Sequence, residues 1–342
     1  MTTESILSPR RYKIEWALLG IALLILGASI SFWLYKEYLD IAAGERDRLQ
    51  AQARVIDGNL GHQLKGMDGA LKSILNEFPP STFKNSRLEA SQHIRALKTG
   101  MPGVRSIFIL DAEGRLFAAT WDNFISGQDF SHREYFKTPR GRPDPDTLYV
   151  STPFTTVTGT YSLNVSRVAI GPNREFAGLV TATLDPDYFN VVLRSVLYAP
   201  DMATSIAHAD GRVFVTQPES EQTLGRNLAM PGSNFSRYQD SGQTAAVMIG
   251  IRLATGEERM RALRTVERAE LRMDKPLVIT VGRSVSAMFA SWRYEVFVNG
   301  GFYGLFAITM SIGLYLSQKR RLGNYATKRQ AVEALSGACQ QV

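Results

Sequence analysis

The stretch that decides the fold is Ile107-Phe108-Ile109-Leu110-Asp111-Ala112-Glu113-Gly114-Arg115-Leu116-Phe117. Its two apolar ends flank a short polar centre with a glycine, a residue that adopts positive φ without strain, so it predicts a β-hairpin. The same pattern returns 97 residues later as Thr204-Ser205-Ile206-Ala207-His208-Ala209-Asp210-Gly211-Arg212-Val213-Phe214. One short hairpin is a weak signal, but its repetition predicts two copies of one module.

Each hairpin is followed by segments in which apolar and polar residues alternate, as they do in half-buried strands. These segments are 148–153, 161–169 and 178–184 after the first hairpin, and 245–252, 260–266 and 277–282 after the second. The order predicts two tandem antiparallel α+β modules.

A long helix is predicted over residues 36–79, before the first module. Its apolar residues are three or four positions apart, and Pro79 and Pro80 end it. The members of this narrow seam are Ala53, Ile56, Leu60, Leu64, Met67, Leu71, Ile74 and Phe78. The seam fits a coiled-coil stalk that forms a homodimer, and it fits equally well a helix that lies on its own domain.

Two uncharged apolar runs, Trp16 to Tyr35 and Val296 to Leu316, enclose almost all of the polar sequence. Each has about 20 residues, enough for a helix to cross a bilayer. Lys and Arg residues precede the first run and follow the second. Because short basic flanks stay in the cytoplasm, this predicts cytoplasmic ends and an external central domain. A cleaved signal peptide is the alternative for the first run, but its apolar core is longer than such peptides have.

The sequence Asp129-Phe130-Ser131-His132-Arg133-Glu134-Tyr135-Phe136 resembles the D-x-S-x-R-x-Y-F signature of double Cache domains, which are tandem PAS-like sensor domains of bacterial receptors. Ser166-Arg167-Val168-Ala169 and Asp185-Pro186-Asp187-Tyr188-Phe189 resemble the end of the membrane-distal module of that family. The resemblance covers about residues 40–295 and is closest to variants on diguanylate cyclases and sensor histidine kinases.

This resemblance implies an α+β protein of the bacterial inner membrane, whose sensor domain is periplasmic or extracellular. Two transmembrane helices would flank a long helix and two tandem PAS-like antiparallel-sheet modules. The expected segments are a cytoplasmic N-terminus at 1–13, transmembrane helices at 14–35 and 295–316, a stalk helix at 36–79, a distal module at 80–190, a proximal module at 191–294 and a cytoplasmic tail at 317–342.

The resemblance also implies a ligand site in the distal module. Arg133 is expected to hold a ligand carboxylate, because its planar guanidinium matches two oxygens at once. The alternative is that Arg133 pairs with Asp129 or Glu134 and only fixes the loop. The further candidate ligand-binding residues are His132, Tyr135, Asp185, Tyr149, Ser162 and Asn164.

The match to the amino-acid-binding subset of the family is incomplete. That subset has a Trp-Tyr pair where this chain has Tyr135-Phe136, and a tyrosine where this chain has Gln128. The sequence therefore favours a small organic anion as the ligand, without deciding for an amino acid.

No catalytic, cofactor-binding or metal-binding motif occurs in the sequence, and the four histidines share no ligand spacing with acidic residues or Cys339. The net charge of +7 has no nucleic-acid motif beside it, and basic membrane flanks account for part of it. We therefore expect a receptor without catalysis that signals to a separate cytoplasmic protein. The alternative is the sensor half of a diguanylate cyclase or a histidine kinase.

Overall fold

The computed structural model of the chain describes residues 9–82, 86–122, 125–156, 159–220, 222–251, 256–267 and 270–339. Part of the predicted N-terminal segment 1–13 and the last residues of the predicted tail lie outside the described residues. The chain divides into two compact units. One unit is Gly44–Ala287, and the other combines Met1–Ala43 with Met288–Val342.

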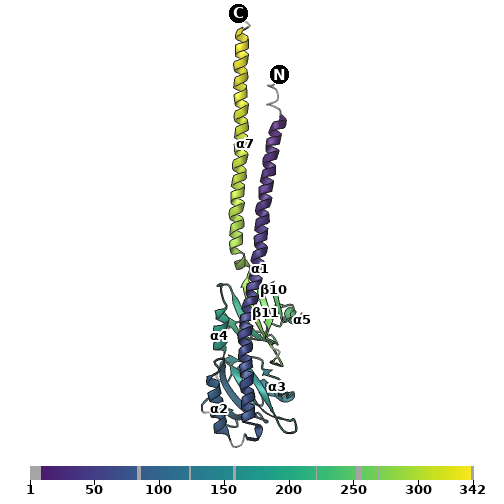
Figure 1. The fold of residues 1–342 in the computed structure, drawn as a ribbon, viewed down its shortest axis with the longest axis vertical. Coiled ribbons are helices and arrows are strands. Elements are labelled where there is room, and N and C mark those ends of the chain that lie inside the picture. Colours follow the sequence, from purple (N-terminus) through teal and green to yellow (C-terminus); the bar gives the residue numbers. More distant parts are fainter. Residues whose placement is uncertain are drawn as a thin grey trace. The chain divides into compact units, whose positions relative to one another are not determined.

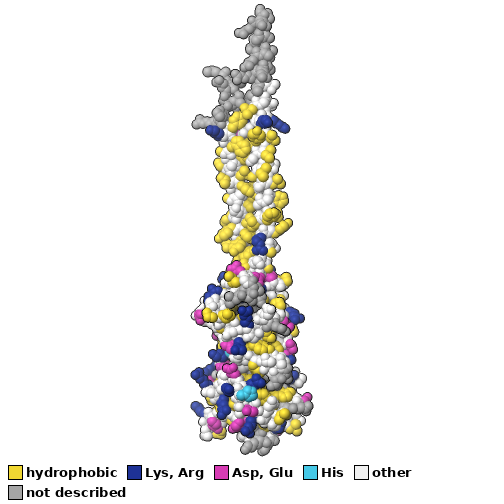
Figure 2. All heavy atoms as spheres, turned by 180° about the vertical axis from the view of Figure 1, so that it is seen from behind, with side chains coloured by type: hydrophobic (Ala, Val, Ile, Leu, Met, Phe, Trp, Pro, Cys, Tyr) yellow, Lys and Arg dark blue, Asp and Glu magenta, His cyan; other side chains and the backbone are white. Residues whose placement is uncertain are grey.

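Two long helices form the unit that combines the two ends of the chain (Figure 1). They are α1 (Pro9–Glu77), whose first part lies in this unit, and α7 (Ala290–Cys339). Both are long and apolar enough to cross a membrane, and their most apolar windows are not buried within the protein. Figure 2 shows their surface as a nearly continuous apolar band with Lys and Arg at its end. The predicted spans 14–35 and 295–316 fall within these helices.

Polar groups join the two helices at several levels within this unit. The Trp16 indole donates to Gln318 Oε1 at 3.1 Å, and the Tyr303 hydroxyl donates to the carbonyl oxygen of Leu23 at 2.9 Å. Near Ala290, the rings of Tyr38 and Phe289 stack with centroids 4.4 Å apart. These contacts hold α1 and α7 side by side.

The first module is an antiparallel sheet in the order β2-β1-β7-β6-β3. Its strands are β1 (Val104–Asp111), β2 (Leu116–Ala119), β3 (Tyr149–Val150), β6 (Asn164–Ile170) and β7 (Phe176–Leu184). A separate two-stranded ladder joins β4 (Phe154–Thr155) to β5 (Tyr161–Ser162).

The second module repeats this arrangement with the order β10-β11-β12-β8-β9. Its strands are β8 (Ala203–His208), β9 (Val213–Gln217), β10 (Ala245–Ile251), β11 (Glu258–Thr265) and β12 (Leu277–Ser284). In both sheets the hairpin occupies one edge and the last strand of the module pairs with the first. The predicted α+β class with two tandem antiparallel modules is confirmed.

The turns of the two hairpins need glycine. Gly114 has a φ of 85° and Gly211 a φ of 93°, a region that side chains with a Cβ rarely adopt. A Cβ on Gly114 would also lie 2.7 Å from Ser131 Cα. The sequence repeat is therefore a repeated turn conformation.

Short helices, which were not predicted from the sequence, complete the modules. They are a 3₁₀ turn η2 (Pro80–Thr82), α2 (Arg87–Thr99), α3 (Glu134–Gly141), α4 (Pro186–Ser195), α5 (Asn234–Asp240) and α6 (Val285–Met288). Helix α2 packs on β1 and β2, and α4 packs on β8 and β9. The expected module boundary between residues 190 and 191 falls inside α4.

The second part of α1, from Gly44, lies along both modules (Figure 1). Every residue of the apolar seam is at most 3% exposed in the single chain. Buried carboxylates on the same helix pair with the sheets: Asp68 with Arg167 of β6, and Asp57 with Arg264 of β11 at 2.8 Å. The interpretation of this seam as a coiled-coil dimer stalk is therefore wrong, because the protein's own sheets cover it.

Candidate functional site

The candidate site lies on the face of the first sheet that is turned away from α1. On that face Tyr149, Ser166, Thr181 and Phe108 are direct neighbours across four strands. The Ser166 and Thr181 hydroxyls are 2.8 Å apart. Because side chains alternate along a strand, this row continues into a second polar pair, Asn164 and Thr183. A buried sheet face with this many hydroxyl and amide groups is unusual for a purely structural core.

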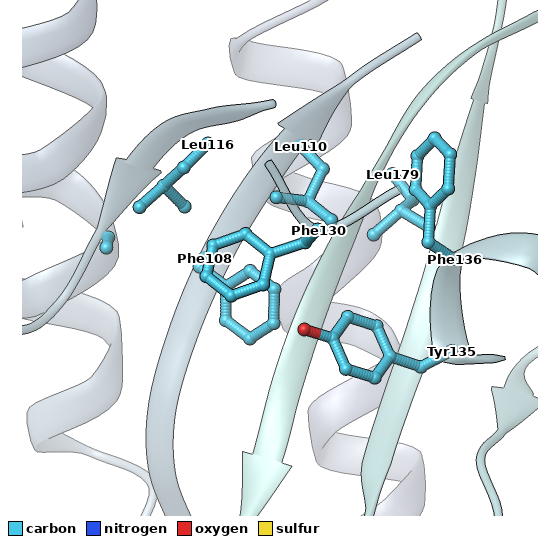
Figure 3. Packing of buried hydrophobic residues seen from close by; sticks show 8 residues of the cluster. Phe108, Leu110, Leu116, Phe130, Tyr135, Phe136 and Leu179 are labelled. Carbon is cyan, nitrogen blue, oxygen red and sulfur yellow. The ribbon is translucent and has the colours of Figure 1, made fainter. Parts of the chain in front are cut away.

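An aromatic cluster covers part of the same face (Figure 3). Tyr135 enters from α3, and Figure 3 shows its hydroxyl pointing over the sheet toward Phe108. Its ring centroid is 5.9 Å from that of Phe108 and 5.3 Å from that of Phe154. Burial raises the pKa of the Tyr135 hydroxyl, and the nearby charge of Arg133 partly opposes this. Tyr135 therefore presents a neutral hydroxyl to the site.

Arg133 is the N-cap residue of α3, and its side chain is half buried. Its Nε is inaccessible to solvent and makes no hydrogen bond. Among the residues that the structure describes, neither Asp129 nor Glu134 forms an ion pair with it; Asp129 instead accepts from the amide of Ser131 at 2.7 Å. The role of Arg133 in ligand binding stays a prediction.

Asn164 is 1% exposed, and neither its Oδ1 nor its Nδ2 has a hydrogen-bond partner among the residues that the structure describes. A buried amide without partners is destabilising, since it has lost its bonds to water and gained none in return. The side chain can accept one hydrogen bond and donate two. Arg133 and Asn164 each carry buried polar atoms without a partner among the described residues, and neither residue lines the cavity described next.

A cavity of about 250 Å³ opens beside this face. Its residues come from α3, from the region of β3, from β6 and from the second module. They are Glu134, Tyr135, Thr138, Pro139, Tyr149, Val150, Ser151, Thr152, Ser166, His208, Asp210, Asp274 and Lys275.

The second module contributes four ionisable residues to this cavity: His208, Asp210, Asp274 and Lys275. His208 Nδ1 lies 2.8 Å from Asp210 Oδ1, and the amide of Val150 donates to Asp274 Oδ1 at 2.7 Å. Burial raises the pKa of Asp274, against hydrogen bonds from the Val150 and Lys275 amides. Burial also opposes ionisation of Asp210, but hydrogen bonds from Arg212 and His208 keep its pKa below the usual value.

The structure places the other predicted residues as follows. Tyr149 lines the cavity, but its hydroxyl already bonds to the Arg142 carbonyl and to the Asp144 amide. Ser162 is buried and donates to the carbonyl of Leu184. His132 is exposed. Asp185 is the N-cap of α4, where it accepts from the amide of Asp187 at 3.2 Å, and it does not line the cavity.

His208, Asp210 and Asp274 were not predicted from the sequence. They are far from the signature around Arg133 in the chain, and only the packing of the two modules brings them to it. His208 and Asp210 belong to the second hairpin, which was interpreted as a turn alone. Within the described ranges, no group of three or more His, Cys, Asp or Glu could hold a metal ion.

Comparison with solved structures relates this fold to sensor domains. The extracellular domain of a protein described as the histidine kinase rpHK1S-Z16 is similar at 25% identity and a TM-score of 0.60, covering 73% of this chain and 99% of that one. The periplasmic sensory domain of the Campylobacter jejuni chemoreceptor Tlp1 has 13% identity and a TM-score of 0.56, covering 73% and 98%. The ligand-binding domain of the Pseudomonas fluorescens chemoreceptor CtaA, in complex with L-isoleucine, has 15% identity and a TM-score of 0.53, covering 75% and 99%.

No family model matches the chain, and no curated protein matches it. The fold itself is that of the extracellular and periplasmic ligand-binding domains of histidine kinases and chemoreceptors. The predicted resemblance to a double Cache sensor domain is confirmed at the level of the fold.

Proposed function

We propose that this chain is a receptor of the bacterial inner membrane that binds a small carboxylated molecule in its distal module. The unpaired, buried Nε of Arg133 carries this proposal, together with the sensor fold. A carboxylate on this guanidinium would form charge-assisted hydrogen bonds, which are about twice as strong as neutral ones. Asn164 and the hydroxyl of Tyr135 are the neutral groups that would complete the site.

Amino acids are the first ligands to test. CtaA was solved with L-isoleucine, and the ligand-binding domain of Mlp24 was solved with asparagine. In this chain, Asp210 and Asp274 line the cavity and offer carboxylates to a ligand ammonium group. Asp185, which the family resemblance suggested for this role, is occupied as a helix cap. The class of ligand that fits is therefore a small carboxylate, with or without an amino group.

The test is a thermal unfolding screen of the full chain in lipid nanodiscs with amino acids and other small carboxylates. A ligand that binds only the native state at about 100 times its Kd adds roughly 2.7 kcal/mol of stability. Arg133→Ala should abolish the shift and leave the unliganded melting temperature nearly unchanged, because the guanidinium has no hydrogen bond or ion pair to the described residues that the substitution would break. Arg142→Ala is the matched control, since Arg142 is exposed at the other end of α3.

A melting temperature that falls sharply in unliganded Arg133→Ala would show a structural role for Arg133. A shift that persists in this variant would place the ligand elsewhere.

A binding site of this kind serves a free-standing receptor and the input domain of a sensor enzyme equally well. We propose that the binding signal passes through α7 to a cytoplasmic protein, because α7 continues as one helix from Ala290 to Cys339. Autophosphorylation or cyclase activity of the purified chain would contradict both the receptor and the alternative of a sensor half without its catalytic domain.

A further inference from the structure

A larger cavity, of about 590 Å³, lies in the second module. This volume is in the range of pockets that bind small molecules, which is about 300–1,000 Å³. Its floor is the face of the second sheet turned away from α1, where Leu263, Thr280, Ser205 and Thr216 are direct neighbours across four strands. The position corresponds to that of the candidate site in the first module.

The charged side chains that line this cavity are all positive among the described residues. Four arginines line it: Arg226, Arg237, Arg259 and Arg261. No aspartate or glutamate is among the described residues that line it. The apolar part of the lining includes Leu228, Phe235, Ile249 and Leu263. A cavity with excess positive charge and apolar walls favours an organic anion.

Three of the arginines have partners in the protein. Arg259 donates to Glu257 Oε2 at 3.1 Å, Arg261 donates to the carbonyl of Gly250 at 3.1 Å, and Arg237 donates to Asn234 Oδ1. Arg226 is half buried, and its guanidinium has no hydrogen bond or ion pair to the part of the chain that the structure describes. The charge of Arg226 is therefore available to a ligand.

Two neutral groups of the lining are also unpaired. Thr280 Oγ1 and Asn234 Nδ2 are inaccessible to solvent and make no hydrogen bond to the described residues. Asn234 lies against Gly250, where an added Cβ would be 2.5 Å from Asn234 Oδ1. A ligand with hydrogen-bonding oxygens would satisfy both groups.

Arg226 of the second module is structurally equivalent to Gln128 of the first. The amide of Leu116 donates to the carbonyl of Gln128 at 2.9 Å. In the same way, the amide of Val213 donates to the carbonyl of Arg226 at 3.1 Å. One module thus has a neutral amide at this position and the other a cation, so the two modules present different chemistry to a ligand.

We propose that the second module holds a binding site of its own, for a small carboxylate with an apolar body, and that Arg226 receives the carboxylate. Thr280 and Asn234 add neutral hydrogen bonds, and Leu228, Phe235 and Leu263 contact the apolar body. This site is separate from the one around Arg133 and does not depend on the function proposed for the first module.

The test uses the full chain in lipid nanodiscs, labelled with ¹³C at the methionine methyl groups. Met230 lines the cavity and reports on it, and Met230→Leu assigns its signal. The probes are acetate, butyrate, hexanoate, benzoate and phenylacetate, each beside its primary amide. At least one carboxylate should shift the Met230 signal in a saturable way, while its amide should bind at least tenfold more weakly.

Arg226→Ala should weaken that binding at least tenfold, whereas Arg133→Ala and Arg194→Ala should not change it. Arg194 is the matched control, being exposed on α4 and outside the cavity. Thr280→Val keeps the side-chain volume and should weaken binding without lowering the melting temperature. The proposal is overturned if no carboxylate shifts Met230, if the amides bind equally well, or if binding survives Arg226→Ala.

Discussion

Buried polar side chains fall into two groups in this protein. Those between α1 and the sheets include ion pairs, such as that of Asp68 with Arg167. Those around the two cavities include unpaired atoms, on Arg133 and Asn164 in the first module and on Asn234 and Thr280 in the second. The ion pairs stabilise the contact of α1 with the sheets, and we propose that the unpaired atoms of the first and second modules named above bond to a ligand.

The pair of Asp68 and Arg167 tests the first group. Arg167 is 1% exposed, so removing the Asp68 carboxylate leaves a buried cation whose remaining acceptor among the described residues is the Pro145 carbonyl, at 2.7 Å. Asp68→Ala should therefore lower the free energy of unfolding by about 3–5 kcal/mol. The control is Glu270→Ala, which breaks an exposed pair with Lys65 and should cost less than about 1 kcal/mol. Urea unfolding of both variants measures this, and equal losses would contradict it.

The raised pKa of Asp274 predicts that the stability of the protein depends on pH. Burial raises its pKa in the folded protein, so the native state binds its proton more tightly than the unfolded chain does. Its ionisation then lowers stability as the pH rises from the ordinary aspartate pKa through the raised value. Asp274→Asn keeps an oxygen for the Val150 amide and should raise the melting temperature at pH 7. This gain should vanish near pH 3, where wild-type Asp274 is protonated; a gain that is constant with pH would contradict this account.

The sequence predicted that α1 is a helix, but it did not predict what the apolar seam of α1 packs against. The three- and four-residue spacing of the seam from Ala53 to Phe78 predicted the helix correctly. It could not say what the seam packs against, because a partner chain and a sheet of the same chain require the same apolar spacing. The buried Asp57 and Asp68 settle the matter, since their partners Arg264 and Arg167 belong to this chain's own strands.

The buried seam predicts the reactivity of introduced cysteines. Ile56 is fully buried, whereas its neighbour Val55 is 56% exposed. With Cys339 replaced by serine, Val55→Cys should react rapidly with a maleimide in native full-length protein, and Ile56→Cys should react only after unfolding. Rapid labelling or efficient interchain crosslinking at position 56 would show that the seam is open to a partner. A homodimer remains a prediction, and its contacts must lie on other surfaces.

The strands were predicted from the sequence because their signal is local. Alternation and the two glycine turns were enough to identify most of both sheets. The site was harder, since Arg133 and Tyr135 belong to a recognisable signature while His208 and Asp274 reach the cavity only through the packing of two modules. No motif near Arg226 in the sequence predicts a binding role for it, because that proposed role depends on a cavity formed by residues that are distant in the chain.

For the whole molecule, two apolar helices and an extracytoplasmic sensor fold predict a single orientation in the membrane. The basic residues Lys319, Arg320 and Arg321 follow the apolar part of α7 and favour the cytoplasmic side. Alkaline phosphatase fused after Gly225 should therefore be active, because this enzyme folds only outside the cytoplasm. A fusion after Arg329 should be inactive, and the reverse pattern would invert the topology.

The central claim is that the first module binds a carboxylate through Arg133. The most direct measurement is a structure of the full chain with the ligand that the thermal screen finds. The claim predicts a ligand carboxylate within hydrogen-bonding distance of Arg133 Nε, with Asn164 also bonded to the ligand. A ligand bound elsewhere, with Arg133 Nε still unpaired, would contradict it.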